Sequence, residues 1–295
     1  MRGRAKLAVA VALLGLAALA ALFGVSRDSG SPEAELAAAG PNCEGFPATI
    51  VGTEGGDTLE GTSGPDVIVA MGGNDTIRSY GGDDVICGGN GSDRIMTGDG
   101  ADASIGGPGD DWVSSVAGGD RVVGGPGDET VDLTTSSAAP VSLLGDEGLD
   151  LLTLTVSGTE PVLVDQAEQL LILGPEPDHE PGAIGGWELV WLKGDHPWTY
   201  VGTDLSDSVI ALGGSLSAST YGGNDVVSAG AGDDIVNGGE GRQDVAAVVG
   251  GSNSCSETEW GDCDDTLALP GVRPVRAPGQ PGQLVRAARA ASTSA

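Results

Sequence analysis

The sequence predicts an all-β fold in which short strands and glycine turns stack into a solenoid. Three observations predict it. The chain of 295 residues contains 52 glycines and only a few aromatic residues. It carries 43 acids against 13 bases, a formal net charge of −30. A nine-residue period then runs from Gly52 to Asp132 without an insertion. The composition argues against a large globular core, and the regular spacing argues against an acidic disordered chain.

Nine consecutive units make up this first array. Typical units are GGNGSDRIM at 88–96 and GGPGDDWVS at 106–114. The fourth position is glycine in all nine, the sixth is Asp in eight and Glu129 in the ninth, and the eighth is Leu, Ile or Val everywhere except at Ser104. In a helix, nine residues would turn successive aspartates to opposite faces. The period therefore predicts repeated short strands and turns, not helices.

Each unit is expected to hold one strand and one turn. Positions seven to nine, such as Thr76-Ile77-Arg78, place an apolar side chain between two others, which suits a three-residue strand with its middle residue facing inward. Positions one to six form the turn, where glycine adopts backbone angles closed to other residues. Two units make one coil of eighteen residues with strands on two opposed sheets, and stacked coils lie about 4.8 Å apart.

The stacking predicts two rows of carboxylates. One edge would carry Asp57, Asp75, Asp93, Asp111 and Glu129, and the other Asp66, Asp84, Asp102 and Asp120. Two unit charges about 4.8 Å apart repel by about 3.5 kcal/mol at an effective dielectric of about 20. A cation between neighbouring carboxylates would remove this repulsion. Carboxylate and carbonyl oxygens in adaptable loops favour Ca²⁺, with Mg²⁺ ranked second because it demands stricter octahedral geometry.

The units resemble the GGxGxDxUx nonapeptides of the RTX, or haemolysin-type, calcium-binding repeat family. GGNGSDRIM and GGPGDDWVS fit the whole pattern, whereas GTEGGDTLE and SVAGGDRVV lack one or both leading glycines. The resemblance implies a parallel β-roll with Ca²⁺ held between turns by the sixth-position aspartates and by loop carbonyls. It assigns as side-chain ligands Asp57, Asp66, Asp75, Asp84, Asp93, Asp102, Asp111 and Asp120. Glu129 is left out because its longer side chain changes the reach.

The period breaks after Asp132 and returns at Gly202. Apart from one degenerate unit at 145–153, residues 133–201 show strand-like runs without the period, and we interpret them as irregular coils of the same solenoid or a small β insertion. A second, weaker array at 202–246 adds the metal-ligand candidates Asp207, Asp225 and Asp234. Leu216 replaces the acid in one unit, and Asp244 comes one residue late. The chain thus divides into segments 1–26, 27–51, 52–132, 133–201, 202–246, 247–268 and 269–295.

The terminal segments indicate export. Residues 1–26 combine three basic residues with an apolar run from Leu7, the layout of a signal peptide, with an uncleaved membrane anchor as the alternative. Residues 27–51 are expected to be a linker or cap, and the proline- and alanine-rich tail 269–295 is expected to be disordered. We therefore expect the remaining chain to be secreted or displayed at the cell surface.

The four cysteines then fit a disulfide-permissive compartment. Four cysteines allow three pairings, and the spacing favours Cys43–Cys87 and Cys255–Cys263. The second bridge would close a C-terminal cap at 247–268. Zinc is the competing interpretation of these cysteines, and it is weak because the sequence has no CxxC motif.

The function classes follow from what the sequence contains. HExxH and GxSxG motifs are absent from the sequence, so we expect no enzyme and no effector domain. The first hypothesis is an exported calcium-binding β-roll protein that folds on Ca²⁺ binding outside the cell and has a structural, adhesive or cell-surface role. Its partners would be calcium ions and cell-surface or extracellular polymers, with no nucleic acid and no membrane contact beyond the anchor.

Two alternatives stay open. The first is an enzyme or carbohydrate-binding module with its site in residues 154–201, using Asp178, Glu180 or the tryptophans Trp187, Trp191 and Trp198. Core packing is the favoured role for these tryptophans. The second is passive calcium buffering at the cell surface.

Overall fold

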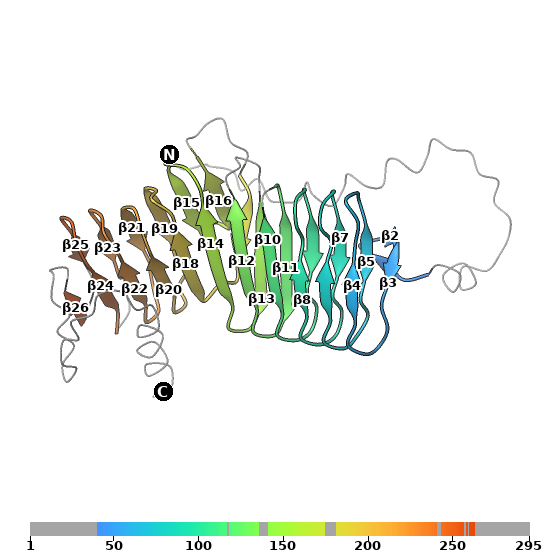
Figure 1. Cartoon of the computed structure of the whole chain (residues 1–295). Helices are drawn as coiled ribbons and strands as arrows, with labels where there is room; N and C mark the ends of the chain where they lie inside the picture. Colours follow the sequence, from blue (N-terminus) through green and yellow to red (C-terminus); the bar gives the residue numbers. More distant parts are fainter. Residues whose placement is uncertain are drawn as a thin grey trace, which may run out of the picture. The chain divides into compact units, whose positions relative to one another are not determined.

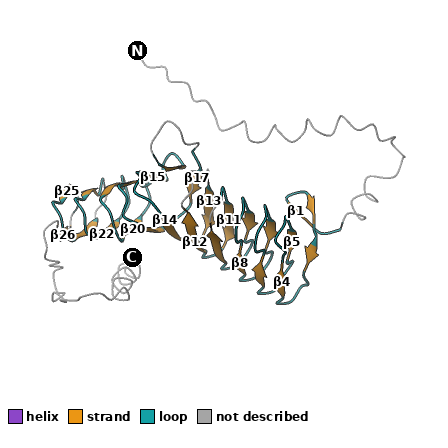
Figure 2. Cartoon of the chain, turned by 45° about the horizontal axis from the view of Figure 1, so that its top comes forward, coloured by secondary structure: helices purple, strands orange, loops and turns teal. Residues whose placement is uncertain are grey.

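The fold is taken from a computed structural model, which describes residues 40–116, 118–135, 141–174, 181–240, 243–256, 258 and 260–262. The described residues from Pro41 onward belong to one compact unit. The expected signal peptide, most of the N-terminal linker, the expected disordered tail, Cys263, Asp178 and Glu180 lie outside the described residues. Figure 2 shows that the described part consists of strands and loops.

The predicted all-β parallel solenoid is confirmed (Figure 1). One face is a continuous sheet of 11 strands in the order β26-β24-β22-β20-β18-β14-β12-β10-β8-β6-β4. Its strands are β4 (Thr58–Glu60), β6 (Thr76–Arg78), β8 (Arg94–Met96), β10 (Trp112–Val116), β12 (Thr130–Thr135), β14 (Leu151–Val156), β18 (Leu189–Lys193), β20 (Ser208–Ala211), β22 (Val226–Ala229), β24 (Val245–Val248) and β26 (Trp260–Asp262).

The opposite face is divided between two sheets, of 7 and 6 strands. The first contains β3 (Ile50–Val51), β5 (Val67–Val69), β7 (Val85–Cys87), β9 (Ala103–Ile105), β11 (Arg121–Pro126), β13 (Ser142–Glu147) and β17 (Ala183–Gly185). The second contains β16 (Leu170–Leu173), β15 (Val162–Asp165), β19 (Trp198–Val201), β21 (Leu216–Ser219), β23 (Ile235–Asn237) and β25 (Ser254–Ser256). Every second strand of the first array pairs in parallel, at a separation of 18 residues, as in Ile77↔Ile95 of β6 and β8.

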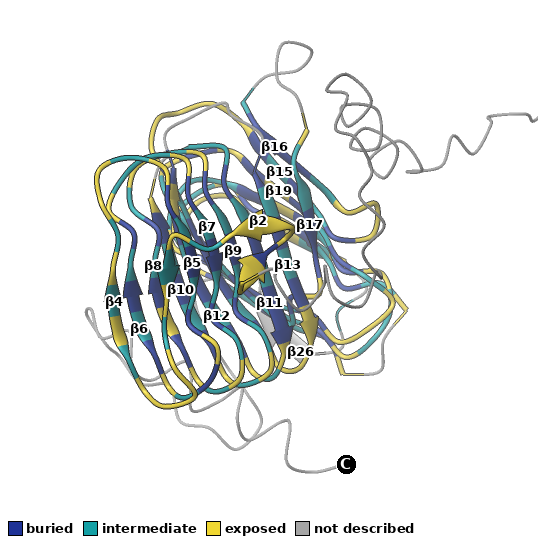
Figure 3. Ribbon diagram, turned by 90° about the vertical axis from the view of Figure 1, so that its right-hand side faces the viewer, coloured by how far each residue is buried: buried dark blue, intermediate teal, exposed yellow. Residues whose placement is uncertain are grey.

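A thin apolar core lies between the two faces (Figure 3). In the first array it is a stack of single eighth-position side chains, and Ile68, Ile77, Ile86 and Ile95 are each 0% exposed. The middle of the chain adds bulkier buried residues, including Trp187, Trp198 and Tyr200. Because burial of apolar area is the main favourable term in folding, the middle segment gains more from packing than the arrays on either side of it.

The irregular segment, residues 133–201, continues the solenoid and adds a hairpin to it. After β14 the chain forms the antiparallel hairpin β15–β16, then β17 pairs with β13, and β18 pairs with β14. The 11-stranded sheet therefore passes from β14 to β18 without a gap. The opposite face takes up the extra residues as β15 and β16, and β15 pairs with β19 to start the last sheet. The segment is thus both a continuation of the coils and a β insertion.

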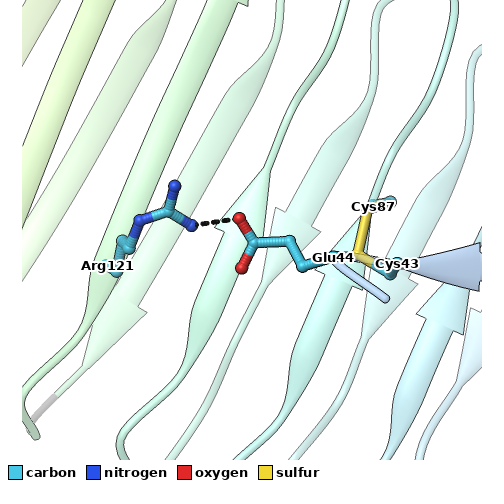
Figure 4. A network of polar contacts seen from close by, with 4 residues as sticks. All are labelled: Cys43, Glu44, Cys87 and Arg121. Atoms are coloured by element: carbon cyan, nitrogen blue, oxygen red, sulfur yellow. Dashed lines mark hydrogen bonds and ion pairs between the residues drawn. A yellow bond between two sulfur atoms is a disulfide. The ribbon is translucent and has the colours of Figure 1, made fainter. Parts of the chain in front are cut away.

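An N-terminal strap, Asn42–Pro47, crosses the outside of the seven-stranded sheet (Figure 4). It consists of the hairpin of β1 (Asn42–Cys43) and β2 (Phe46–Pro47). Cys43 is disulfide-bonded to Cys87 of β7, with a Cα–Cα distance of 5.8 Å, as the spacing predicts. Glu44 forms an ion pair of 2.7 Å with Arg121 of β11. The strap is therefore tied to strands of two different coils, β7 and β11. Cys255 is disulfide-bonded, and its predicted partner Cys263 lies outside the described residues.

Candidate metal ladder

The sixth-position acids of the arrays form ladders at the edges of the sheets. Each aspartate lies directly before a strand, and within a row it accepts, through Oδ1, the backbone N–H of the acid one coil earlier. Asp75 accepts from Asp57 at 2.6 Å, Asp93 from Asp75 at 2.8 Å, and Asp111 from Asp93 at 2.7 Å. The carboxylates thus cap the turns that the glycines form, which holds them in register and buries them.

Glycine is required where successive turns touch. At Gly91, the fourth position of its unit, φ is 120°, and an added Cβ would lie 2.0 Å from the Gly73 carbonyl oxygen of the previous coil. A side chain at this position would separate the coils. The fourth-position glycines therefore allow successive turns to pack closely. This close packing lets the carboxylate of one turn reach the backbone N–H of the neighbouring turn.

The ladder beside the 11-stranded sheet continues through the irregular segment. Glu129 N–H donates to Asp150 Oδ1 at 2.9 Å, and Asp150 N–H donates to Glu188 Oε2 at 2.8 Å. Asp225 N–H then donates to Asp244 Oδ1 at 3.1 Å. Every strand of this sheet from β4 to β24 is therefore preceded by an acid: Asp57, Asp75, Asp93, Asp111, Glu129, Asp150, Glu188, Asp207, Asp225 and Asp244.

The ladder on the other edge is shorter. Asp84 Oδ1 accepts the Asp66 N–H at 2.8 Å. Asp102 Oδ1 accepts the Asp84 N–H, and Asp120 Oδ1 accepts the Asp102 N–H, both at 2.9 Å. Val141 and Pro197 stand before β13 and β19. The pattern returns where Leu216 N–H donates to Asp234 Oδ1 at 2.8 Å. The middle of this edge therefore offers no carboxylate row to a cation.

One buried oxygen of most ladder acids has no protein partner. Oδ1 is used by the backbone, while Oδ2 is buried and makes no hydrogen bond. Both oxygens of Glu129 are also buried without a hydrogen-bond partner. The unpartnered Oδ2 atoms belong to Asp75, Asp84, Asp93, Asp102, Asp111, Asp150, Asp225, Asp234 and Asp244. A buried unpaired carboxylate oxygen is costly, so a row of them indicates a missing positive partner.

The first acid of each run is satisfied differently. A threonine of the same unit donates its backbone N–H to Oδ2: Thr53 to Asp57 at 2.6 Å, and Thr62 to Asp66 at 2.7 Å. Thr203 donates likewise to Asp207 at 2.9 Å. Ser115 donates its hydroxyl to Asp120 Oδ2 at the far end of the second edge. Of the eleven aspartates assigned from the sequence, Asp66, Asp120 and Asp207 therefore have both oxygens paired within the protein, and Asp57 has its Oδ2 paired.

The space beside the unpartnered oxygens suits an oxygen-liganded cation. A Cβ added to Gly88 would lie 2.5 Å from Asp93 Oδ2 and 2.7 Å from the Gly106 carbonyl oxygen. A Cβ added to Gly106 would lie 2.2 Å from Asp111 Oδ2 and 2.7 Å from the carbonyl oxygen of the next coil. Glycine thus leaves room where a carboxylate and a carbonyl converge. Among the described residues no three His, Cys, Asp or Glu side chains cluster, so a cation here would take further ligands from the backbone.

Burial shifts the ladder acids towards their protonated form. Loss of solvation raises the pKa of Asp93 and Asp102 to about 6 and that of Asp111 to about 7. The backbone hydrogen bond opposes each shift, and neighbouring carboxylates add to it. Burial and then the charge of Asp150 raise the pKa of Glu129 to about 8. A cation would reverse these shifts because it stabilises the ionised carboxylate.

These repeats match a known family of sequences. The RTX calcium-binding nonapeptide repeat is found in four copies, at residues 51–86, 70–104, 105–134 and 219–242. The chain carries RTX calcium-binding repeats. Repeats of this family bind Ca²⁺, and the parallel coils described above are those of an RTX β-roll. A comparison with curated proteins finds no match.

Four ladder acids were not among the metal ligands assigned from the sequence. Glu129 has a longer side chain, Asp244 comes one residue late in its unit, Asp150 lies in the degenerate unit, and Glu188 lies in the irregular segment. Successive acids along this part of the ladder are 21 and then 38 residues apart instead of 18, so the nine-residue period cannot find them. The available signal was local: each acid directly precedes an apolar strand of two-residue alternation.

The alternative site in residues 154–201 is mostly filled by core packing. Trp187 is 2% exposed and Trp198 is 1% exposed, which confirms the favoured role for these two. Trp191 lies on the outer face of β18, with the Lys193 ammonium 5.7 Å from its ring centroid. Asp178 and Glu180 lie outside the described residues.

His196 fixes the loops around the β15–β16 hairpin, on the sheet edge where Pro197, and not an acid, precedes β19. Its side chain is buried, with Nδ1 at 3.0 Å from the Glu160 carbonyl oxygen and Nε2 at 2.7 Å from the Val156 carbonyl oxygen. Both contacts are hydrogen bonds only when both ring nitrogens carry a proton. His196 then joins the β14–β15 loop to the β18–β19 loop, and this junction needs no metal.

Proposed function

We propose that this chain is an exported protein whose RTX arrays fold when Ca²⁺ binds outside the cell, and that the folded roll has a structural, adhesive or cell-surface role. The observation that carries the proposal is the row of buried carboxylate oxygens that lack a protein partner and face backbone carbonyls. The proposed side-chain ligands are those aspartates assigned from the sequence that have such an oxygen, Asp75, Asp84, Asp93, Asp102, Asp111, Asp225 and Asp234.

The negative charge of the chain makes folding of the arrays depend on calcium. At a net charge of −30, stacking the ladder brings like charges to neighbouring coils. Without a cation this repulsion and the loss of solvation oppose the folded arrays. Binding energy from Ca²⁺ offsets both terms, so metal binding and folding are coupled. Extracellular calcium is about millimolar, which suits weak sites of this kind, whereas the low calcium inside a cell would leave the arrays unfolded.

Two further features support export. Residues 1–26 have the layout of a signal peptide, and disulfides such as Cys43–Cys87 persist in oxidising compartments. Among the described residues no helix is long and apolar enough to span a membrane. RTX β-rolls are generally structural. A role for the roll itself, and not for an attached catalytic site, is consistent with that.

The test is calcium binding by the full chain, followed by isothermal titration at neutral pH after treatment with a chelator. The proposal expects several bound Ca²⁺ per chain, with binding lost when the ligands named above are changed to Asn. Binding that stays unaltered in the Asn variants would refute the ligand assignment. Secretion is tested separately, by expressing the gene in its own host and measuring the protein in the medium and on the cell surface. Retention of the protein in the cytoplasm would contradict export.

A further inference from the structure

A groove runs along the turns that lead into the 11-stranded sheet in the second array. It consists of two adjoining cavities of about 440 Å³ and about 360 Å³, and Asp204 and Tyr221 line both of them. Residues 165–168, in the turn of the β15–β16 hairpin, form one wall of the first cavity, and the turn between β19 and β20 forms the other. The second cavity continues past the turns before β22 and β24. We call the two cavities together the Tyr221 groove. One of its walls comes from the hairpin insertion, which the repeats alone would not supply.

Tyr221 is held in a backbone conformation that costs free energy. Its φ is 62°, in the left-handed region that favours glycine, and Gly239 occupies the same position of the next unit on this edge with φ 81°. The Tyr221 side chain is 51% exposed, and its hydroxyl makes no hydrogen bond within the described part of the chain. The ring therefore contributes little to the core in return for the strain. A strained residue of this kind points to a use outside the fold.

The polar lining of the groove accepts hydrogen bonds. The carboxylates of Glu168, Asp204 and Glu240 are exposed and form no hydrogen bond or ion pair with the described residues. An ionised carboxylate is an acceptor only. The described residues that line the two cavities include no lysine or arginine. The groove therefore suits a ligand that donates hydrogen bonds and carries no negative charge.

The backbone of these turns is already paired. Gly222 N–H donates to the Thr203 carbonyl oxygen, and Glu240 N–H donates to the Tyr221 carbonyl oxygen. An extended peptide that adds to a sheet needs free backbone groups, and these groups are not available to it. Contacts in the groove are therefore made by side chains, with an aromatic ring among carboxylates. A sugar ring matches this arrangement, because its C–H face packs against an aromatic ring while its hydroxyl groups donate to carboxylates.

We propose that the Tyr221 groove binds a saccharide chain that carries no negative charge. Asp204, Tyr221 and Glu240 come from three successive turns of this edge, since β20, β22 and β24 pair in order. Successive turns are about 4.8 Å apart, so the ring has a carboxylate on either side along the groove. Tyr221 would pack against one sugar ring, and Asp204 and Glu240 would accept hydrogen bonds from hydroxyl groups on either side of it. The inference names the kind of polymer that the roll would hold outside the cell, and it rests on the proposed function only for the folding of the second array.

The experiment is binding of the full chain, in millimolar Ca²⁺, to an array of neutral, amino-sugar and uronic-acid oligosaccharides. Calorimetry then follows with the oligosaccharide that binds most tightly. We expect binding to neutral or amino-sugar chains and none to uronic-acid chains. Tyr221→Gly should lower the affinity by about tenfold or more, because the ring is lost. Since glycine stands at this position in other units, the variant should keep its fold, and urea unfolding in calcium would verify this.

Tyr80→Gly is the matched control. Tyr80 stands at the same position of its own unit, with φ 75° and 52% exposure, but it lines neither cavity. Its replacement should leave the saccharide affinity unchanged. A double variant, Asp204→Asn with Glu240→Gln, removes the charge and keeps an acceptor at both places. It should bind the uronic-acid chains that the wild type rejects.

The outcomes separate this inference from the proposed function. A wild-type chain that folds in calcium but binds no neutral or amino-sugar chain overturns the groove alone. Saccharide affinity that is unchanged in Tyr221→Gly, or that falls equally in Tyr80→Gly, overturns it as well. Binding of an oligolysine peptide without any saccharide would mean that the acids attract cations in general, and would also overturn it. If the wild type binds no calcium, the proposed function fails, whereas saccharide binding that is lost in Tyr221→Gly would still support the groove.

Discussion

Replacing Asp93 by Asn should stabilise the metal-free protein and weaken the calcium-bound one. In the metal-free state Asn keeps the Oδ1 acceptor for the Asp75 N–H, at 2.8 Å in the wild type. It removes a buried negative charge whose pKa is raised, mainly by burial, from 3.8 to about 6. Ionising such a group in the folded state costs about 3 kcal/mol, at about 1.4 kcal/mol per unit of pKa. Solvent at the edge of the sheet reduces the expected gain to about 1–2 kcal/mol.

In calcium the sign reverses. Asp93 Oδ2 is the unpartnered oxygen beside the Gly106 carbonyl, and a neutral amide is a poorer calcium ligand than a carboxylate. We expect the calcium concentration at the midpoint of folding to rise about tenfold, which is about 1.4 kcal/mol. The loss should be larger when the calcium sites on both sides of Asp93 are affected.

The assay is urea unfolding followed by circular dichroism at pH 8, in excess chelator and in millimolar Ca²⁺. Asp99→Asn is the matched control, because Asp99 is exposed and the same charge is removed. The control should change little in either condition. The reasoning is refuted if Asp93→Asn destabilises the chain in chelator, or if it leaves the calcium-bound state as stable as the wild type.

Three further predictions concern other parts of the molecule. First, His196→Ala removes the ring contacts to the part-buried Glu160 carbonyl oxygen and the buried Val156 carbonyl oxygen, so it should lower the unfolding free energy by about 1–3 kcal/mol equally with and without calcium, as measured by urea unfolding; a loss seen only in calcium would contradict this. Second, reducing the Cys43–Cys87 bridge, which closes a separation of 44 residues, removes a constraint on the unfolded chain of about 4 kcal/mol and should raise the calcium midpoint of folding; an unchanged midpoint after verified reduction would count against the strap. Third, burial raises the pKa of Asp111 to about 7 and that of Glu129 to about 8, so the metal-free folded state keeps protons that the unfolded chain has released, and its stability should fall as pH rises from about 4 to about 8. Calcium should cancel this fall, since the ion replaces the protons; thermal unfolding across this pH range with and without calcium would detect a metal-free stability that instead rises with pH.

The period of the sequence was enough to predict the coils of the first array. Glycine and aspartate recur there at fixed spacing because each coil is packed against identical neighbours. Residues such as Asp75 and Asp93 could therefore be placed on one edge, 18 residues apart, before their hydrogen bond was seen. The Cys43–Cys87 bridge followed from the spacing as well, although its place on the outside of the sheet did not, because nothing in the strap is periodic.

The middle of the ladder could not be predicted in this way. A solenoid tolerates extra residues in its turns, since each coil contacts only its neighbours. The step from Asp150 to Glu188 contains a whole hairpin, yet the two acids meet in space as Asp75 and Asp93 do. The period registers such an insertion as a break. Pairing of the flanking strands β14 and β18 restores the register, and that pairing is a tertiary property.

The far-ultraviolet circular dichroism of the full chain during a calcium titration tests the central claim most directly. The chain should be prepared at pH 8 in excess chelator and brought to millimolar Ca²⁺. The account predicts that β-sheet signal rises with calcium and that the unfolding midpoint rises with it, because the ladder oxygens gain their missing partner. A chain with the same spectrum and the same unfolding midpoint in chelator and in calcium would contradict it.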